Sequence, residues 1–154
     1  MTDVEERLAR ALHDTYLRQR LAAGERLGAR LSLTEWDTLP EEFKQSSRRN
    51  ARDIDSAVSA LGYELRETDD TETGRMLSDD EIELVAVRLH ERWVEEREAN
   101  GWRAGAQRND GERIHPDLVP WDSLPEARRE IDRHLVRELP GLLERVGLVL
   151  ERLS

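Results

Sequence analysis

The sequence predicts a mainly α-helical protein of two tandem helical repeats related by a pseudo-two-fold axis, each ending in a short β-strand. Two duplicated motifs support this prediction. The segments Leu12–Arg20 and Leu89–Arg97 each carry a histidine, an aromatic residue and an arginine at relative positions 0, +3 and +7. The motif Trp-Asp-x-Leu-Pro-Glu begins at Trp36 and again at Trp121. Apolar residues spaced three and four positions apart accompany the first motif in both copies, which is typical of amphipathic helices.

The length and composition suit one compact domain. A chain of 154 residues with 37% hydrophobic residues can build one modest core but not two independent ones. The charged fraction of 38%, beside 5% aromatic residues, is typical of helices with solvated outer faces. The formal net charge of −10 opposes binding to a nucleic-acid backbone, although a few convergent arginines can still hold a small anion. We therefore expect no nucleic-acid partner.

Redox and targeting signals are not found in the sequence. It contains no cysteine, so neither disulfides nor thiolate chemistry are expected. The first six residues are acidic and lack the apolar core of a signal peptide, and no run of about 18 apolar residues could span a bilayer. We expect a cytoplasmic protein without membrane association.

The first long helix is expected from Asp3 to Ala23. Thr2-Asp3-Val4-Glu5 has the spacing of a capping box, and Gly24 follows as a residue suited to the left-handed conformation just past a helix. The second copy repeats this pattern, with a capping box at Ser78-Asp79-Asp80-Glu81 and a closing glycine at Gly101. The two glycines are 77 positions apart (101 − 24), the same offset that separates the two motif histidines.

A second pair of helices is expected after the Trp-Asp-x-Leu-Pro-Glu motifs. The two tryptophans are 85 positions apart (121 − 36), so the second copy has gained eight residues (85 − 77) in the preceding loop. Thr38 and Ser123 have the position of N-caps, with the motif glutamate three residues later. We expect these helices to break before shorter helices at Ile54–Leu61 and Leu139–Val146.

Each copy ends in a glycine followed by an alternating or apolar segment. These segments, Leu61–Leu65 and Val146–Leu150, are expected to form two short strands that could pair. Residues 67–76 are acidic, rich in threonine and nearly free of apolar side chains, which predicts a mobile linker. The predicted organisation is a first, degenerate repeat at 1–66, an acidic linker at 67–76 and a second repeat at 77–154, together one compact domain.

Several separated motifs of the second copy carry a family resemblance. They are His90-Glu91-Arg92-Trp93, Gly101-Trp102-Arg103-Ala104-Gly105, the segment from His115-Pro116 to Trp121, and Leu124-Pro125. In this order they resemble the RyR domain, a repeat found in tandem pairs in ryanodine receptors and as a free-standing module in bacteria. The first copy keeps the histidine, the aromatic residue, the tryptophan and the Leu-Pro pair, but it lacks the Gly-Trp and His-Pro signatures.

The resemblance implies a stand-alone bacterial or phage member of this family, with a pair of helical repeats. It also implies ligand recognition, because tandem repeats of this family are associated with binding adenine nucleotides in the cleft between repeats. The expected ligand is a nucleotide or a nucleotide-derived signal, such as an adenine nucleotide, an ADP-ribose-like molecule or a cyclic nucleotide.

Residue types that suit such a ligand recur on one helix face in both copies. An aromatic side chain from each repeat would sandwich a planar base, while arginines would receive phosphates. The candidate ligand-binding residues are Tyr16, Arg20, Trp93, Arg97, His13, His90, Trp102, Arg103, Arg108 and Arg113. The last four belong to the loop Trp102–Pro120, which has no full-length equivalent in the first copy and is expected to fold over one end of the cleft.

Structural roles are the alternatives for the same residues. Tyr16 and Trp93 can be core aromatics, and His13 and His90 can be buried residues hydrogen-bonded to a neighbouring loop. The two motif arginines can pair with glutamates of their own helices. Trp102 can be either a loop anchor or one wall of the pocket.

Sequence signals for catalysis are weak, so we expect no enzyme activity. The chain has no phosphate-cradling P-loop, no Gly-x-Gly-x-x-Gly after a strand, and no second histidine at zinc-binding spacing beside His90-Glu91. No metal and no cofactor are expected. The alternative to a nucleotide receptor is a protein-interaction module, in which the cleft holds a partner's peptide or the acidic surface docks a basic partner. Self-association and an effector protein both stay open as partners.

Overall fold

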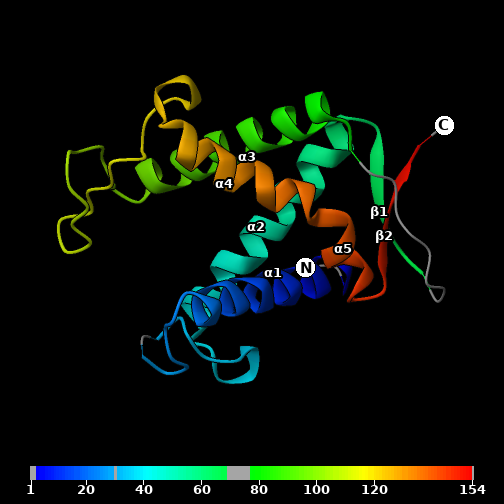
Figure 1. Ribbon diagram of the computed structural model, residues 1–154, viewed down its shortest axis with the longest axis horizontal. Helices are drawn as coiled ribbons and strands as arrows, with labels where there is room; N and C mark the ends of the chain where they lie inside the picture. Colours follow the sequence, from blue (N-terminus) through cyan, green and yellow to red (C-terminus); the bar gives the residue numbers. More distant parts are fainter. Residues whose placement is uncertain (1–2, 30, 69–76, 154) are drawn as a thin grey trace. The chain divides into compact units, whose positions relative to one another are not determined.

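The computed structural model describes residues 3–29, 31–68 and 77–153. Within these ranges the chain forms five α-helices and one two-stranded sheet (Figure 1). The predicted mainly helical class is therefore confirmed. The chain divides into two compact units, one formed by Met1–Met76 together with Glu138–Ser154 and the other by Leu77–Arg137.

The first unit combines two long helices with a short helix and the sheet. Its elements are α1 (Asp3–Ala22), the 3-10 turn η1 (Trp36–Thr38), α2 (Glu41–Ala60), β1 (Tyr63–Glu67), α5 (Leu139–Glu144) and β2 (Leu148–Arg152). Helices α1 and α2 pack on each other, and Leu8 and Leu12 of α1 and Ile54 and Val58 of α2 are buried. Burial of each such side chain stabilises the fold by about 1.5–3 kcal/mol. The apolar spacing that predicted the first helix marks its buried face.

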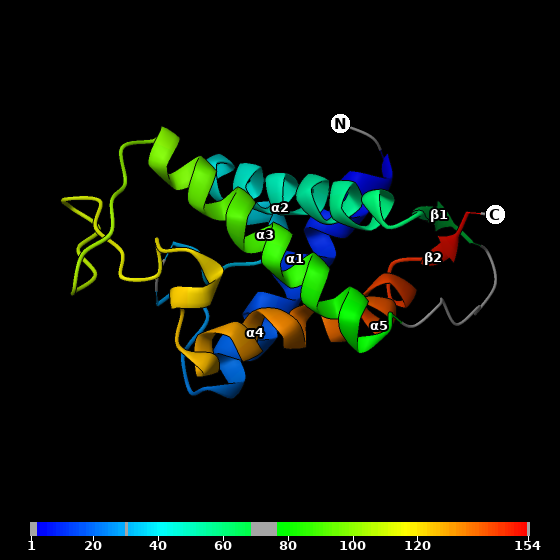
Figure 2. The ribbon, with the colours of Figure 1, turned by 90° about the horizontal axis from the view of Figure 1, so that it is seen from above.

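Strands β1 and β2 pair antiparallel and lie side by side (Figures 1 and 2). Leu65 lies opposite Leu150, and both are buried. Tyr63 lies opposite Arg152, whose guanidinium carbon is 5.5 Å from the centre of the tyrosine ring. The two predicted short strands are confirmed, and they form one sheet.

The second unit is built on α3 (Asp79–Ala99) and α4 (Glu126–Arg137), with the 3-10 turn η2 (Trp121–Ser123) before α4. The capping box predicted at the start of α3 is confirmed. The backbone N–H of Glu81 donates to the hydroxyl oxygen of Ser78 at 3.2 Å, and the Ser78 N–H donates to the Glu81 carboxylate at 2.9 Å. These bonds satisfy two backbone N–H donors. One of them, that of Glu81, lies in the first turn of the helix, where N–H groups have no intrahelical partner. Gly101 has a φ of 86° and Gly24 one of 97°, so both adopt the predicted left-handed conformation after their helices.

The predicted N-caps of α2 and α4 are wrong. Thr38 and Ser123 each end a 3-10 turn, and the helices begin only at Glu41 and Glu126. The leucine between the predicted N-cap and the proline explains why each helix begins later. Leu39 has a ψ of 133° and Leu124 one of 143°, so both have an extended backbone. A residue that precedes proline avoids the helical region, because its backbone N–H and Cβ clash with the proline ring. The helix therefore cannot begin before the proline.

The predicted break in the second helix of the first copy is also wrong, because α2 runs without interruption to Ala60. It contains neither proline nor glycine. In the second copy the corresponding break is real: α4 ends at Arg137, and α5 begins at Leu139 with Pro140 in its first turn. Proline is tolerated there because the N–H that it lacks would have no intrahelical partner.

Part of the predicted organisation lies outside the described residues. This holds for residues 69–76 of the acidic linker and for Thr2 of the first capping box. Glu67, at the start of the predicted linker, belongs to β1. The pseudo-two-fold axis and the single compact domain stay predictions. None of the described helices is both long and apolar enough to cross a membrane.

Candidate functional site

A buried histidine stands at the centre of the first motif in each repeat. His13 is 5% exposed and His90 3% exposed. The Nε2 atom of His13 lies 2.6 Å from the carbonyl oxygen of Thr34, and that of His90 lies 2.7 Å from the carbonyl oxygen of Val119. Because a carbonyl oxygen only accepts, Nε2 is the donor in both bonds. Each histidine therefore ties its helix to the loop that precedes the second motif, which is the structural role that the sequence left open.

Each histidine also packs against the tryptophan of its own repeat. The ring centres of His13 and Trp36 lie 6.1 Å apart, those of His90 and Trp121 lie 5.9 Å apart, and both interplanar angles are 60°. Residues matched at offsets of 77 and 85 thus occupy equivalent local positions. Trp121 is buried, and its indole N–H donates to Glu83 at 3.1 Å, so this tryptophan belongs to the core of the second unit.

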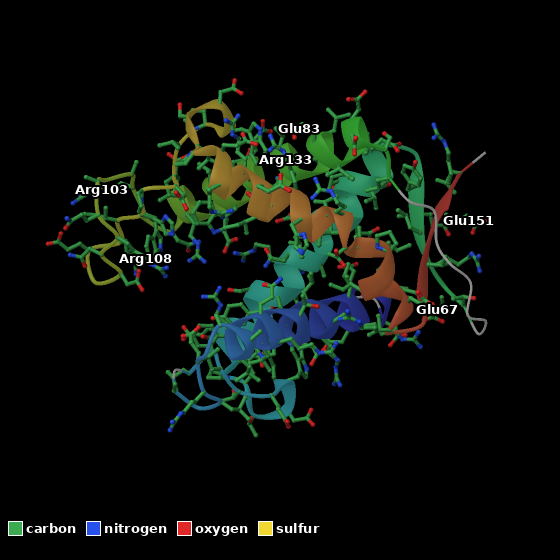
Figure 3. All side chains as sticks on the ribbon, viewed as in Figure 1. Glu67, Glu83, Arg103, Arg108, Arg133 and Glu151 are labelled. Carbon is green, nitrogen blue, oxygen red and sulfur yellow. The ribbon has the colours of Figure 1, made fainter. Side chains whose placement is uncertain are left out.

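A paired arginine and glutamate recur at the same offsets. Arg48 donates to the carboxylate of Glu6 at 2.8 and 3.1 Å, and Arg133 donates to that of Glu83 at 2.6 and 3.2 Å (Figure 3). These bonds lower the pKa of both glutamates from the usual value. The arginine joins the helix after the second motif to the helix of the first motif, so both repeats use the same internal brace.

In the second repeat, the first motif leads into an aromatic cluster around one arginine. The ring centres of Trp93 and His90 lie 5.8 Å apart. The guanidinium carbon of Arg97 lies 6.0 Å from the centre of the Trp93 ring and 5.4 Å from that of Trp102. The ring of His115 meets Trp93 edge-on, with the centres 5.1 Å apart. Trp93, Arg97, Trp102 and His115 form what we call the Arg97 cluster.

Arg97 has no carboxylate partner among the residues that the structure describes. Its Nε atom is buried there without a hydrogen-bond partner. The nearby loop carboxylate of Asp110 is bound by Arg108 at 2.9 Å, and that bond is the main cause of its lowered pKa, to which Arg97 adds a smaller part. Two indole rings therefore flank a cation that forms no ion pair with any described residue, an arrangement that can accept an anion beside a planar ring.

His115 completes the cluster as a neutral group at neutral pH. Burial lowers its pKa from the usual 6.5, against an opposing effect of Asp117, and the positive charges of Arg108, Arg128 and Arg97 lower it further. Its Nδ1 accepts the backbone N–H of Asp117 at 3.0 Å, so the neutral ring carries its proton on Nε2. His115 is not among the ligand-binding residues predicted from the sequence, although the His-Pro signature contains it.

Residues 76–152 match the family model of the RyR domain, a span that covers half of the chain. The chain belongs to the RyR domain family. The match includes the whole Arg97 cluster. It also extends beyond the second unit, which ends at Arg137, and takes in α5 and β2.

The first repeat lacks an equivalent of the Arg97 cluster. Under the offset of 77, Arg20 corresponds to Arg97 and Glu25 to Trp102. Arg20 is exposed, and its Nη1 lies 3.6 Å from the carboxylate of Glu25. The hydroxyl of Tyr16 lies 3.1 Å from that of Ser32. A carboxylate thus stands beside the first motif arginine where the RyR-matching repeat has an indole ring.

The three arginines of the long loop are exposed in this RyR domain (Figure 3 labels Arg103 and Arg108). Arg108 pairs with Asp110 at 2.9 Å. Arg113 donates to the carbonyl oxygen of Asn100 at 2.6 Å and so caps the end of α3. The side chain of Arg103 has no ion pair among the described residues. Of the three, Arg103 is the one that can turn to a ligand without giving up a partner.

A groove of about 480 Å³ lies on another side of α3 in the RyR domain. It is lined by His90, Glu91, Val94, Glu95, Glu98 and Leu118–Trp121. Its floor is largely apolar, and three glutamates follow one side of the helix. Except for His90, none of the candidate ligand-binding residues lines this groove, so the groove and the Arg97 cluster are chemically distinct places.

Proposed function

We propose that this RyR domain protein is a non-enzymatic receptor for a nucleotide or nucleotide-derived signal in the cytoplasm, and that the Arg97 cluster forms part of its binding site. One observation carries the proposal. The guanidinium carbon of Arg97 lies within 6.0 Å of two tryptophan ring centres, its buried Nε has no hydrogen-bond partner, and it forms no ion pair with a described residue. The indole rings can stack on the base of a nucleotide, and the guanidinium group can bind its phosphate.

The chemistry follows from these side chains. A base stacked on an indole face gains about 1–3 kcal/mol per stacking partner, by analogy with base–aromatic stacking in single-strand binding. Phosphate oxygens would accept from Arg97 and Arg103, and the Nε2–H of His115 is a further donor. The association of tandem RyR repeats with adenine nucleotides supports the choice of ligand. That Tyr16 and Arg20 of the first repeat also contact the ligand stays a prediction.

Calorimetry of the full chain against adenine nucleotides, ADP-ribose and cyclic nucleotides tests the proposal, guided by mass spectrometry of the small molecules that co-purify. We expect Arg97→Gln and Trp93→Ala each to weaken binding by about tenfold or more. Arg92→Gln is the matched control, because Arg92 lies on the same helix but is exposed. If no nucleotide binds, or if the folded Arg97→Gln variant binds like wild type, the proposal is wrong.

A protein-interaction role is the second candidate, and the groove beside α3 favours it. Glu91, Glu95 and Glu98 lie on one helix side, so an apolar floor with an acidic edge suits a peptide that carries basic and apolar residues. An arginine-rich amphipathic peptide should then bind the full chain. Changing the three glutamates together to glutamine should abolish that binding and leave nucleotide binding unchanged.

A further inference from the structure

A cationic cavity lies in the first unit, and none of the residues assigned above to a ligand lines it. It has a volume of about 450 Å³ and is lined by Arg10, Ala11, Asp14, Arg18, Arg145 and Val146. Arg10, Asp14 and Arg18 are spaced four residues apart, so they stack on one face of α1. Arg145 is the residue that ends α5. The cavity therefore depends on the packing of α5 against α1 within this unit.

The charges around this cavity do not balance. Three arginines face one aspartate, and that aspartate is engaged by Arg18 at 3.0 Å. Among the described residues, neither Arg10 nor Arg145 has a carboxylate within ion-pair distance. The guanidinium carbon of Arg10 lies 5.7 Å from the ring centre of Trp36, a contact that supplies no negative charge. The carboxylate of Glu6, whose pKa the charge of Arg10 helps to lower, is itself bound by Arg48. Two excess positive charges (three minus one) thus gather in a chain whose formal net charge is −10.

A fourth arginine, Arg7, binds the backbone at the edge of this cavity. The carbonyl oxygen of Val146 accepts from Nη1 of Arg7 at 3.4 Å. One of the two lone pairs of that carbonyl is therefore engaged by a cation. Arg7 itself pairs with Asp3 at 3.1 Å and is not needed for the ligand.

The equivalent face of the second repeat shows that the fold does not impose this charge. Under the offset of 77, Arg10 and Arg18 correspond to Val87 and Glu95, and Asp14 corresponds to Glu91. Glu91 and Glu95 line the acidic groove of about 480 Å³ on α3. The same helix face thus carries a cavity of similar size and opposite charge in each repeat. Each cavity therefore favours a ligand whose charge is opposite to its own.

We propose that the cavity formed by Arg10, Arg18 and Arg145 binds a small anion of the phosphate class that carries at least two negative charges. A guanidinium fork matches phosphate oxygens with paired N–H donors, and several forks around one cavity favour a multiply charged anion over a single carboxylate. The cavity is large enough for a diphosphate. This site is separate in its residues from the Arg97 cluster and does not depend on it.

Titration of the full chain with pyrophosphate at constant ionic strength, followed by calorimetry, tests this site. Arg10→Gln and Arg145→Gln should each weaken binding about tenfold or more. Arg92→Gln removes the same charge from an exposed position on α3 and should change the affinity less than about twofold. Circular dichroism confirms that each variant folds.

Three outcomes would overturn the proposal: no saturable binding of pyrophosphate to wild type, equal weakening by Arg92→Gln, or weakening by Arg97→Gln alone. The last outcome would place the anion in the Arg97 cluster. Nucleotide binding measured on Arg10→Gln separates the two sites, because that variant should retain it whether or not the cavity binds pyrophosphate.

Discussion

Arg133 donates two hydrogen bonds to the carboxylate of Glu83, from Nε at 2.6 Å and from Nη2 at 3.2 Å. These bonds hold the pKa of Glu83 below its usual value of 4.5. Because the folded state lowers this pKa, the pair stabilises the fold at neutral pH, and its contribution is lost as the pH falls through the lowered pKa. We expect Glu83→Gln to have a lower Tm than wild type near neutral pH and a flatter decline on acidification.

Thermal unfolding between about pH 3 and pH 7 measures this difference. Glu91→Gln is the control, since Glu91 is exposed and no contact of its carboxylate is found among the described residues. Parallel pH curves for wild type and Glu83→Gln would show that the brace does not contribute as described.

The buried histidines should act on stability. In His90→Phe the carbonyl oxygen of Val119 loses the donor that lies 2.7 Å away, and the loss of one hydrogen bond costs about 0.5–1.5 kcal/mol. His13→Phe should cost a similar amount through Thr34. Urea unfolding measures both, with the exposed His134→Asn as control. A His90→Phe variant of normal stability that fails to bind nucleotide would instead assign the ring to the ligand.

Gly105 should be the sensitive glycine of the long loop. A Cβ atom at this position would lie 2.4 Å from Cγ2 of Ile114, a β-branched side chain with little freedom to move. The backbone of Ile114 exchanges two hydrogen bonds of 2.9 Å with Asn109. Gly105→Ala should therefore speed hydrogen exchange at these two amides. Gly111→Ala, where the nearest contact is an ordinary 3.4 Å, should leave their exchange rates unchanged.

Salt should separate the two kinds of contact in the Arg97 cluster. The Debye length shrinks from about 10 Å at 0.1 M salt to about 3 Å at 1 M, so the Coulombic part of an arginine–phosphate contact weakens. The affinity lost in Arg97→Gln should become smaller as salt rises, whereas the loss in Trp93→Ala should persist because stacking is not screened. Calorimetry at both salt concentrations gives the comparison. Losses that shrink in parallel would mean that Trp93 acts only by positioning Arg97.

Local signals were enough to predict the helical class, the capping box at Ser78 and the left-handed glycines, because each depends on residues within one turn of another. The duplication offsets also predicted which residues share a local environment, as the two histidine–tryptophan pairs show. The start of α2 was misplaced for a local reason as well. The conformational restriction that Pro40 places on Leu39 outweighed the capping preference of Thr38.

The Arg97 cluster and the cationic cavity could not be predicted from local sequence patterns, because each brings together residues that are distant in the sequence. Trp93 and Arg97 share a helix face, but the contact with His115 requires the fold of an irregular loop. Arg10 and Arg145 are brought to one cavity only because α5 packs on α1, across more than a hundred residues of sequence. Their charge looked like part of a solvated helix face, which is the usual fate of an exposed arginine.

The antiparallel pairing of β1 with β2 also sets an order of events during synthesis. Arg66 and Glu151, which form an ion pair across the sheet, are separated by 85 positions. At about 5–20 residues per second, a ribosome needs about 4–17 s to add that stretch. Until then the edge of β1 has no neighbouring strand, and an unpaired edge is a template for pairing with another chain. The edge of β1 in the nascent first repeat is therefore most exposed to pairing with another chain while the second repeat is being translated.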